Sequence, residues 1–428
     1  MDSVGTHPGT SRAATLAVIV AALGYFVDVY DLILFGMVRT ASLRDLGVTD
    51  TTGEGIYLLN MQMGGMLLGG VLFGVLGDKR GRLSVLFGSI TLYSLANLAN
   101  GFVDSVEQYA WCRLIAGIGL AGELGAGITL VSELMRRETR GIGTTIVAAF
   151  GIFGGVVAGL VGGAFPGIGF EWRTAYFIGG GMGLALLVLR IGVVESGMFA
   201  ALARHPVARG NFGSLFTDRQ RFLRYLAITC VGVPVWYIGG ILCTLAPELG
   251  LALGLPEAPR AATSLFFFYT GASVGDVASG VLSQVLRSRR KTLAIFLTGA
   301  TAAIAAYFGF GGTSLTMFYL MSALGGLTAG YWAVFVSTAA ELFGTNLRAT
   351  VTTTVPNFVR GSLVLLATML TMLREPLGLI GAAVAVGGFA MLVAFLGVWA
   401  LPETFGIDLD FQEGDDAPPP PHARAGRS

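Results

Sequence analysis

Twelve apolar runs of about twenty residues each dominate this sequence, and each run is long enough to cross a bilayer as a helix. The runs begin near Ala14, Ile56, Leu83, Tyr109, Gly141, Thr174, Phe222, Ala261, Thr292, Leu315, Ala349 and Leu377. Charged residues make up only 12% of the 428 residues, about half of their share in soluble domains. Such a chain has too little charge to cover a soluble fold of this size. We therefore expect an all-α membrane protein with twelve transmembrane helices.

Lysine and arginine are distributed unevenly between the breaks that separate the runs. With a cytoplasmic N-terminus, 19 of the 27 Lys and Arg residues fall in cytoplasmic segments and 5 fall in outer segments. Cytoplasmic loops carry an excess of these residues, so the bias predicts that both termini are cytoplasmic. We expect a multi-pass protein of the plasma (cytoplasmic) membrane, and specifically of a bacterial inner membrane.

The sequence contains an internal repeat at an offset of 208 residues. The matching elements are Glu133-Leu134-Met135 with Arg140 and Glu341-Leu342-Phe343 with Arg348, Gly122 and Gly330, and Glu195-Ser196 and Glu403-Thr404. Such a repeat predicts two pseudo-symmetric halves of six helices with a solute site between them. The predicted parts are a cytoplasmic head (1–13), an N-terminal bundle (14–194), a cytoplasmic linker (195–221), a C-terminal bundle (222–400) and a cytoplasmic tail (401–428).

Several motifs resemble those of the major facilitator superfamily, and the resemblance covers about residues 14–410. The resembling elements are the loop Gly74-Val-Leu-Gly-Asp78-Lys-Arg-Gly81-Arg82, the helix-four signature Arg113-x3-Gly117-x-Gly119-x2-Gly122-Glu123, and the motifs Glu195-Ser196 and Pro402-Glu403-Thr404 that end each half in sugar porters. Asp28-Val29-Tyr30-Asp31 is similar to an element of aromatic acid:proton symporters, with Val29 where that family has glycine. The Gly122-Glu123 pair is closer to metabolite:proton symporters. The resemblance implies the major facilitator fold and solute transport.

Asp28 and Asp31 are three residues apart in the first apolar run and therefore share one face of a helix. Acidic residues inside a membrane are costly, and they usually face a cavity and have a function there. The pair suits a site that takes up a proton on one side of the membrane and releases it on the other. A structural ion pair is the alternative. Glu123, near the middle of the fourth run, is either a further protonation site or a hydrogen-bonding partner of a neighbouring helix.

Arg113 is expected at a depth similar to that of Asp31, because both residues fall in the outer half of the predicted bilayer. In sugar:proton symporters, which the chain resembles, a helix-one aspartate pairs with the helix-four arginine. The resemblance thus implies a proton-coupled switch formed by Asp31 and Arg113, and the alternative is that Arg113 only fixes helix packing. Arg190, in the sixth run, is interpreted as extending its charged end toward the membrane surface.

Arg360 lies about eleven residues into the eleventh run, with no acidic residue within four positions on its own helix. Its candidate partners are a substrate anion, Asp276 in the eighth run, or the helix-one aspartates. Aromatic acid symporters have an arginine at the matching position, which implies substrate binding. The other candidates for the solute site are Asp276, Tyr25, Trp236, Tyr237, Tyr269, Tyr331, Trp332 and Asn357. Ordinary helix packing is the alternative for each aromatic residue and for Asn357.

A further group of charged residues falls at the predicted cytoplasmic ends of the runs. Its members are Asp78, Arg82, Glu133, Arg140, Glu341 and Arg348. By resemblance they form salt-bridge networks that exist in one conformation and break in another, which gates the transport path. The three histidines (His7, His205 and His422) lie outside the runs and no phosphate-binding loop is present, so we expect no metal, cofactor or ATP. A net charge of +1 gives no indication of a nucleic-acid partner.

Together these patterns predict a proton-coupled symporter for a small organic anion, specifically a carboxylate, that works by alternating access and as a monomer. Its partners would be the solute, protons and the lipid bilayer. Transporters of phosphate, of a sugar or of a zwitterion, and a drug:proton antiporter, are alternatives. A non-transporting sensor is a distant alternative, because the chain shows no large output domain. An enzyme is not expected, because no nucleophile with a neighbouring base is apparent.

Overall fold

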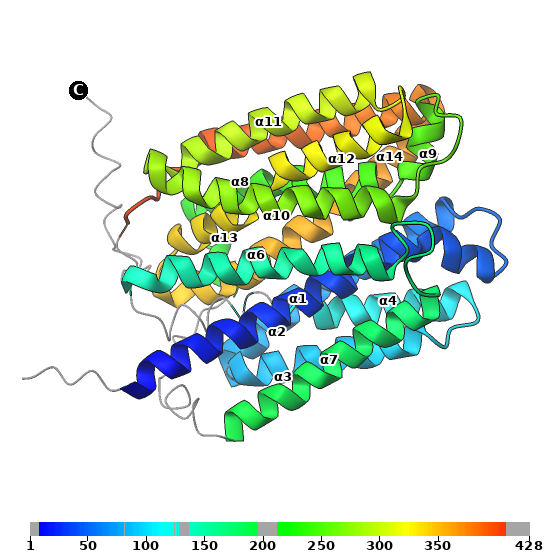
Figure 1. Ribbon diagram of the computed structural model, residues 1–428. Coiled ribbons are helices and arrows are strands. Elements are labelled where there is room, and N and C mark those ends of the chain that lie inside the picture. The colour runs from blue at the N-terminus through cyan, green and yellow to red at the C-terminus, as the bar shows by residue number, and fades with distance from the viewer. Residues whose placement is uncertain are drawn as a thin grey trace, which may run out of the picture.

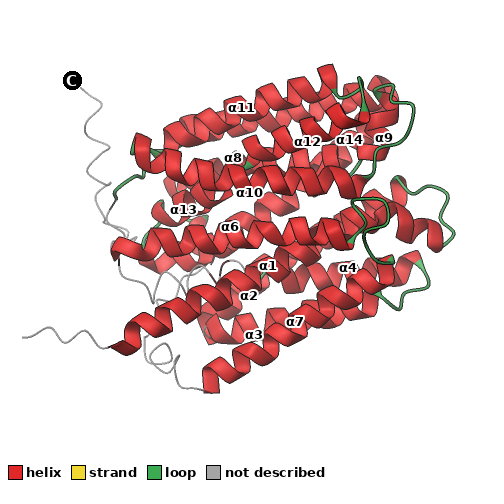
Figure 2. Ribbon diagram, viewed as in Figure 1, coloured by secondary structure: helices red, strands yellow, loops and turns green. Residues whose placement is uncertain are grey.

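The computed structural model describes residues 8–80, 82–123, 125, 127, 137–195 and 212–407. All regular structure in these ranges is helical (Figure 2). The longer helices run along roughly one common direction (Figure 1). Eight helical stretches of the described chain are long and apolar enough to cross a membrane. The predicted all-α membrane fold is thereby confirmed. Residues 1–7 of the predicted head, 196–211 of the linker and 408–428 of the tail lie outside the described residues.

The N-terminal half contains six of the described helices. They are α1 (Pro8–Asp45), α2 (Gly53–Arg80), α3 (Arg82–Asn100), α4 (Val106–Leu120), α6 (Arg137–Val161) and α7 (Trp172–Glu195). α1 packs against α6 and α7, while α4 packs against α2 and α3. The connections from α1 to α2, from α3 to α4 and from α6 to α7 lie at one end, at the right of Figure 1. This end is the one predicted to face outside, and we call it the outer end and the opposite one the inner end.

The C-terminal half begins after the short 3-10 helix η2 (Phe212–Leu215). Its helices are α8 (Arg219–Tyr237), the π-helix η3 (Ile238–Cys243), α9 (Ala246–Ala252), α10 (Ala261–Leu286), α11 (Arg289–Phe310), α12 (Leu315–Ala329), α13 (Trp332–Glu341) and α14 (Thr345–Ala400). α14 contains one non-helical residue, Gly378 (φ 68°, ψ 171°), which separates two helices. The predicted start of the twelfth span, Leu377, is next to it. Every predicted span start lies inside a helix of the structure.

The two halves repeat each other at the predicted offset. α2 shifted by 208 residues covers 261–288, where α10 lies, and α6 shifted in the same way covers 345–369, the first part of α14. The halves contact each other through α2 with α14 and through α6 with α10. Under this shift α2 corresponds to α10, and α6 corresponds to the first part of α14, so the two contacts are equivalent. The interface between the halves therefore shares the pseudo-symmetry of the sequence.

Glycine allows α2 and α4 to approach very closely. A Cβ added to Gly65 would lie 2.2 Å from the Leu114 carbonyl oxygen, and one added to Gly117 would lie 2.1 Å from that of Gln62. Any side chain at either position would collide with backbone. Gly64, next in the chain, has open space where a Cβ would be. Small residues at such contacts are the usual means of close packing between membrane helices.

The span formed by α12 and α13 is interrupted at Gly330 and Tyr331. A Cβ at Gly330 would lie 2.6 Å from the Ala272 carbonyl oxygen, so α10 passes close to the break. The break exposes amides at the start of α13 that have no partner within the helix. One of them, the Ala333 amide, donates a hydrogen bond of 2.7 Å to Asp276 of α10. The Asp276 carboxylate therefore caps α13 inside the membrane.

Candidate functional site

Asp28 of α1 and Arg360 of α14 form an ion pair between the two halves. Nη2 of Arg360 lies 3.1 Å from Oδ2 of Asp28, and both side chains are buried, at 1% and 0% exposure. Nε and Nη1 of Arg360 and Oδ1 of Asp28 have no hydrogen-bond partner among the described residues. Of the partners considered for Arg360, a helix-one aspartate is the one in contact. Asp276, the other acidic candidate, instead caps α13.

The ion pair borders a cavity between the halves, and residues of both halves line it. Arg360 is a lining residue, and aromatic side chains form much of the wall. The lining residues are Tyr25, Val29 and Leu32 of α1, Ile152 of α6, Val235 and Trp236 of α8, Phe268, Tyr269 and Ala272 of α10, Ala329 of α12 with Gly330, Trp332 of α13, and Arg360 of α14. The cavity thus combines one cationic group with a largely apolar, aromatic surface. Sites of this kind fix a small ligand by a few polar contacts and exclude water elsewhere.

Five of the predicted solute-site residues line this cavity: Tyr25, Trp236, Tyr269, Trp332 and Arg360. The other four have their polar groups engaged elsewhere. The hydroxyl of Tyr237 donates to the Ala383 carbonyl, that of Tyr331 donates to the Val231 carbonyl, the Asn357 amide donates to the Ala121 carbonyl, and Asp276 accepts from Ala333. None of these four is a lining residue, and their hydrogen bonds join separate helical segments.

The sequence reasoning missed Phe268 and the aliphatic part of the wall. Phe268 directly precedes Tyr269 in a run of aromatic residues on α10, and this run is the signal that could have indicated it. The repeat relates Trp236, which the sequence did predict, to Asp28 at the offset of 208 residues. Asp28 of the N-terminal half pairs with the cavity residue Arg360, and Trp236 lines the cavity from the C-terminal half.

Arg113 of α4 does not form a direct ion pair with Asp31 in the part of the chain that the structure describes. It donates to Oδ1 of Asn97 at 3.0 Å and to Oε1 of Gln62 at 3.4 Å. Its guanidinium also stacks over the ring of Tyr176, 5.1 Å from the ring centre. Neutral partners therefore hold Arg113, although its charge still acts on Asp31. Both carboxylate oxygens of Asp31 lack a partner within the described ranges.

Glu123, three residues after the end of α4, pairs with Arg190 of α7. Nη1 of Arg190 lies 3.0 Å from Oε2 of Glu123, and a second contact joins Nη2 to Oε1. Both side chains are buried, with Arg190 only 4% exposed, and they pack against Gly24 of α1. The interpretation of Arg190 as extending toward the membrane surface is therefore wrong. The buried acid explains why, since an unpaired Glu123 in this position would be costly.

A family model described as Major Facilitator Superfamily matches residues 16–368 of the sequence. The chain belongs to the major facilitator superfamily. As a member of this superfamily it is a multi-pass membrane protein and a transporter of small-molecule solutes, and it is not an enzyme.

Several curated relatives are similar to this superfamily member over most of its length. The niacin transporter NiaP of Acinetobacter baylyi is 27% identical over 77% of this chain and 80% of its own. A probable 4-methylmuconolactone transporter of Cupriavidus pinatubonensis is 26% identical over 90% of both chains. The benzoate transport protein of Acinetobacter baylyi is 22% identical over 78% of both chains.

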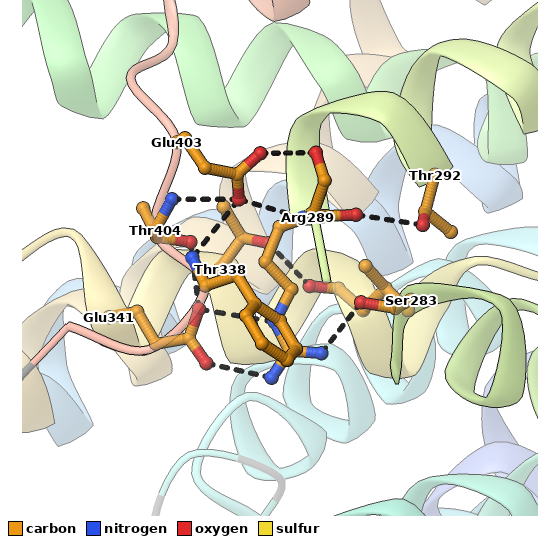
Figure 3. A network of polar contacts seen from close by, with 10 residues as sticks. Ser283, Arg289, Thr292, Thr338, Glu341, Glu403 and Thr404 are labelled. Atoms are coloured by element: carbon orange, nitrogen blue, oxygen red, sulfur yellow. Dashed lines mark hydrogen bonds and ion pairs between the residues drawn. The ribbon is translucent and has the colours of Figure 1, made fainter. Parts of the chain in front are cut away.

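At the inner end of the transporter, polar residues of the C-terminal half form a network (Figure 3). Arg289 at the start of α11 makes two contacts with Glu341 at the end of α13, of 2.9 and 3.2 Å. The Thr404 hydroxyl donates to the same Glu341 carboxylate at 2.7 Å. The network therefore joins the ends of α11 and α13 to the segment that follows α14.

Glu403 extends this network and is held in its ionised form. Its carboxylate accepts hydrogen bonds from the Ser288 hydroxyl and from the backbone amides of Arg289, Thr404 and Phe405. Burial alone would raise the pKa of Glu403, but these hydrogen bonds outweigh it and hold the pKa below its ordinary value.

Four of the remaining gating candidates lie near the same end. Arg348, near the start of α14, donates to the carbonyl oxygens of Ala340 and Phe343 at 2.9 and 3.3 Å. Asp78 lies in the last turn of α2, Arg82 begins α3 and Arg140 lies in the first turn of α6. The side chains of these three residues, and Glu133 as a whole, lie outside the described residues.

The outer end of the transporter contains an ion pair that the sequence did not predict. Arg39 of α1, placed by the sequence among outer charges, is 1% exposed and contacts Glu248 of α9 at 2.7 Å. A hydrogen bond from the Thr52 hydroxyl to the same carboxylate, of 3.0 Å, reinforces the contact. These contacts join the N-terminal to the C-terminal half on the outer side of the cavity.

Proposed function

We propose that this transporter is a proton-coupled symporter that imports a small organic acid, whose carboxylate binds Arg360 in the central cavity. The observation that carries the proposal is the Asp28–Arg360 pair. Arg360 uses one nitrogen for Asp28, and its Nε and Nη1 have no partner within the described residues. A guanidinium group matches a carboxylate in geometry and holds it by two parallel hydrogen bonds.

The charge balance of the pair gives a physical reason for coupling to protons. Asp28 and Arg360 together carry no net charge. An entering carboxylate would add an uncompensated negative charge in the membrane interior, which is costly. Protonation of Asp28 removes this charge and releases Arg360 for the substrate. One proton and one organic anion therefore bind together, and Asp31, Arg113 and Glu123 form the second group of proton-coupling residues in the same half.

The walls of the cavity favour an aromatic acid. The aromatic part of the lining consists of Tyr25, Trp236, Phe268, Tyr269 and Trp332. Aromatic side chains pack well against a flat ring, in stacked or edge-on arrangements. Relatives named for the transport of niacin, benzoate and gentisate support the same substrate class. An aromatic ring with one carboxylate thus fits both the cation and the walls.

The contacts at the two ends of the molecule suit alternating access. The Arg39–Glu248 pair closes the outer end between the halves, and the Glu341–Arg289 network stabilises the inner end of the C-terminal half. Asp78, Arg82, Glu133, Arg140 and Arg348 would belong to the inner gate. We propose that this end faces the cytoplasm of a bacterial cell. Movement of the halves about the cavity would open one side as the other closes.

A thermal-shift screen tests the proposed substrate. The purified protein is heated with benzoate, nicotinate or gentisate, with phosphate, with glucose, and with benzyl alcohol, which keeps the ring and lacks the carboxylate. Ligand binding stabilises the folded state by mass action, so we expect aromatic carboxylates to raise the melting temperature and benzyl alcohol not to. Arg360→Lys should abolish the shift, and Arg260→Lys, at an exposed position, serves as the control.

Two results would contradict the proposal in different ways. Stabilisation by phosphate or glucose without stabilisation by any carboxylate would exclude an organic acid as substrate. Uptake of a stabilising acid into proteoliposomes that does not respond to an inward proton gradient would exclude proton coupling.

A further inference from the structure

A group of buried polar atoms without partners lies in the N-terminal half, apart from the cavity. It comprises both carboxylate oxygens of Asp31, the hydroxyls of Tyr93 and Ser94, and Nδ2 of Asn97, none of which has a hydrogen-bond partner within the described chain. All four side chains are 0% exposed. Unpaired polar groups are expensive in the membrane interior, where no bulk water can satisfy them.

The packing of α7 places two of these residues along one helix face. A Cβ at Gly179 would lie 2.2 Å from Oδ1 of Asp31, and one at Gly183 would lie 2.0 Å from Oγ of Ser94 and 3.1 Å from the ring of Tyr93. Gly179 and Gly183 are one helical turn apart and therefore on the same side of α7. Since neither has a side chain, α7 presents no side-chain atoms at the points where Asp31 and Ser94 approach it.

Tyr93, Ser94 and Asn97 all lie on α3. Tyr93 and Asn97 are four residues apart and share one face of α3. Asn97 is oriented by Arg113, which donates to its Oδ1 at 3.0 Å, so that its amide nitrogen is the unpaired atom. Tyr93 is within electrostatic range of both Asp31 and Glu123.

The charged and titratable neighbours of Asp31 lie on four helices. They are Asp28 and Tyr30 on α1, Tyr93 on α3, Arg113 on α4 and Tyr176 on α7. Of these, Tyr30 donates to the Ala175 carbonyl and Tyr176 is hydrogen-bonded to Tyr109. Tyr93 is therefore the phenol in this set whose hydroxyl remains unpaired within the described ranges.

We propose that Tyr93, Ser94 and Asn97 form, with Asp31, a hydrated proton site within the N-terminal half that is separate from the substrate cavity. None of these four residues lines the cavity. The inference deepens the proposed proton coupling and rests on it for its physiological role. Tyr93, Ser94 and Asn97 act as positioning residues, because they orient the water that carries the proton to Asp31.

The proton step requires only water as the carrier. A hydronium ion transfers its proton to one carboxylate oxygen of Asp31, which leaves a neutral water molecule and a neutral carboxyl group. The Asn97 amide and the Tyr93 hydroxyl can donate hydrogen bonds to the water, and the oxygens of Ser94 and Tyr93 can accept from it. A water with three such partners matches the usual coordination of buried water in proteins.

Infrared difference spectroscopy of the purified full-length protein tests this site without a transport substrate. Spectra recorded at two pH values should contain a carboxylic acid C=O band that is absent in Asp31→Asn. We expect Tyr93→Phe and Ser94→Ala each to move this band to higher wavenumber, because the carboxyl group loses hydrogen bonding. A water O–H band that shifts in oxygen-18 water should disappear in Tyr93→Phe.

Tyr307→Phe is the matched control, since Tyr307 is also buried and its hydroxyl donates to the Leu242 carbonyl in the other half. It should leave both bands unchanged. An Asp31 band that stays in place in both Tyr93→Phe and Ser94→Ala, or the absence of any band assigned to Asp31, would overturn the inference. The bands could shift as expected while uptake of an organic acid shows no dependence on a proton gradient. That combination would refute the proposed symport but would still support the proton site at Asp31.

Discussion

The guanidinium of Arg39 in α1 and the carboxylate of Glu248 in α9 lie 2.7 Å apart and join the two halves at the outer end. Arg39 also donates to the carbonyl oxygens of Thr51 in its own half and of Thr244 in the other, at 2.9 and 3.3 Å. One buried cation is thus shared between the halves. Any conformation that opens the cavity to the outside has to separate Arg39 from Glu248.

Glu248→Gln should therefore shift the transporter toward outward-open conformations. Loss of a buried charge pair costs about 2–5 kcal/mol, so the outward-open population should rise about tenfold or more. Distances between spin labels at the exposed positions Asp104 and Glu257, one in each half, would measure it by electron resonance. Glu107→Gln, at an exposed position on α4, is the control. An unchanged distance distribution in Glu248→Gln would show that the pair does not hold the outer end closed.

Asp28→Asn should separate substrate binding from the proton gradient. Asparagine leaves Arg360 available to a carboxylate but cannot take up a proton. Substrate binding at this pair should then no longer be coupled to the proton gradient. We expect accumulation of an aromatic acid in proteoliposomes to fall at least about tenfold, while exchange of labelled for unlabelled acid persists. Asp45→Asn, at the outer end of α1, should retain accumulation. Full accumulation in Asp28→Asn would refute the role of this aspartate.

Adjacent glycines of α2 should respond in opposite ways to substitution by alanine. Gly65→Ala places a methyl group against the Leu114 carbonyl and should destabilise the protein by about 1–3 kcal/mol or more. Gly64→Ala meets open space and should be neutral or stabilising by up to about 1 kcal/mol, because alanine favours helix. Thermal melting of both variants in one detergent measures the difference, and equal melting temperatures would contradict the close packing of α2 on α4.

Glu403 should make the stability of the transporter depend on pH in the acidic range. Its pKa in the folded protein is lowered by hydrogen bonds from Ser288 and three backbone amides. Its contribution to stability is therefore complete above the ordinary glutamate pKa and is lost as the pH falls through the lowered folded value. We expect Glu403→Gln to melt at a lower temperature than wild type at neutral pH and to lose less stability on acidification. Glu257→Gln, at an exposed position, should follow the wild-type pH profile.

Hydropathy and the repeat predicted the fold well because both depend on local sequence. Twenty apolar residues suffice to define a span, and charged residues mark where it ends, so even the twelfth span could be separated from the eleventh next to Gly378. The offset of 208 residues also predicted which elements correspond between the halves. Neither signal requires knowledge of how one helix is rotated against the next.

The site was harder to predict because it depends on those rotations. Trp236 and Tyr237 are neighbours in the sequence, yet Trp236 lines the cavity while Tyr237 donates to Ala383 in α14. The partner of Arg360 stayed open among three possibilities for the same reason. Residue spacing establishes that a charge lies at mid-membrane, and only the packing of α1 on the other half brings Asp28 to it.

The cap on α13 has a mechanical consequence for the C-terminal half. The carboxylate that completes the first turn of α13 belongs to Asp276 of α10, not to the chain that leads into α13. α10 and α13 are thus linked by a hydrogen bond, whereas α12 and α13, although consecutive, are separated by the break at Gly330 and Tyr331. A displacement that starts at Glu341, at the inner tip of α13, would pull on α10 and so shift Phe268 and Tyr269 in the cavity wall. The inner gate and the aromatic lining of the cavity would then move together.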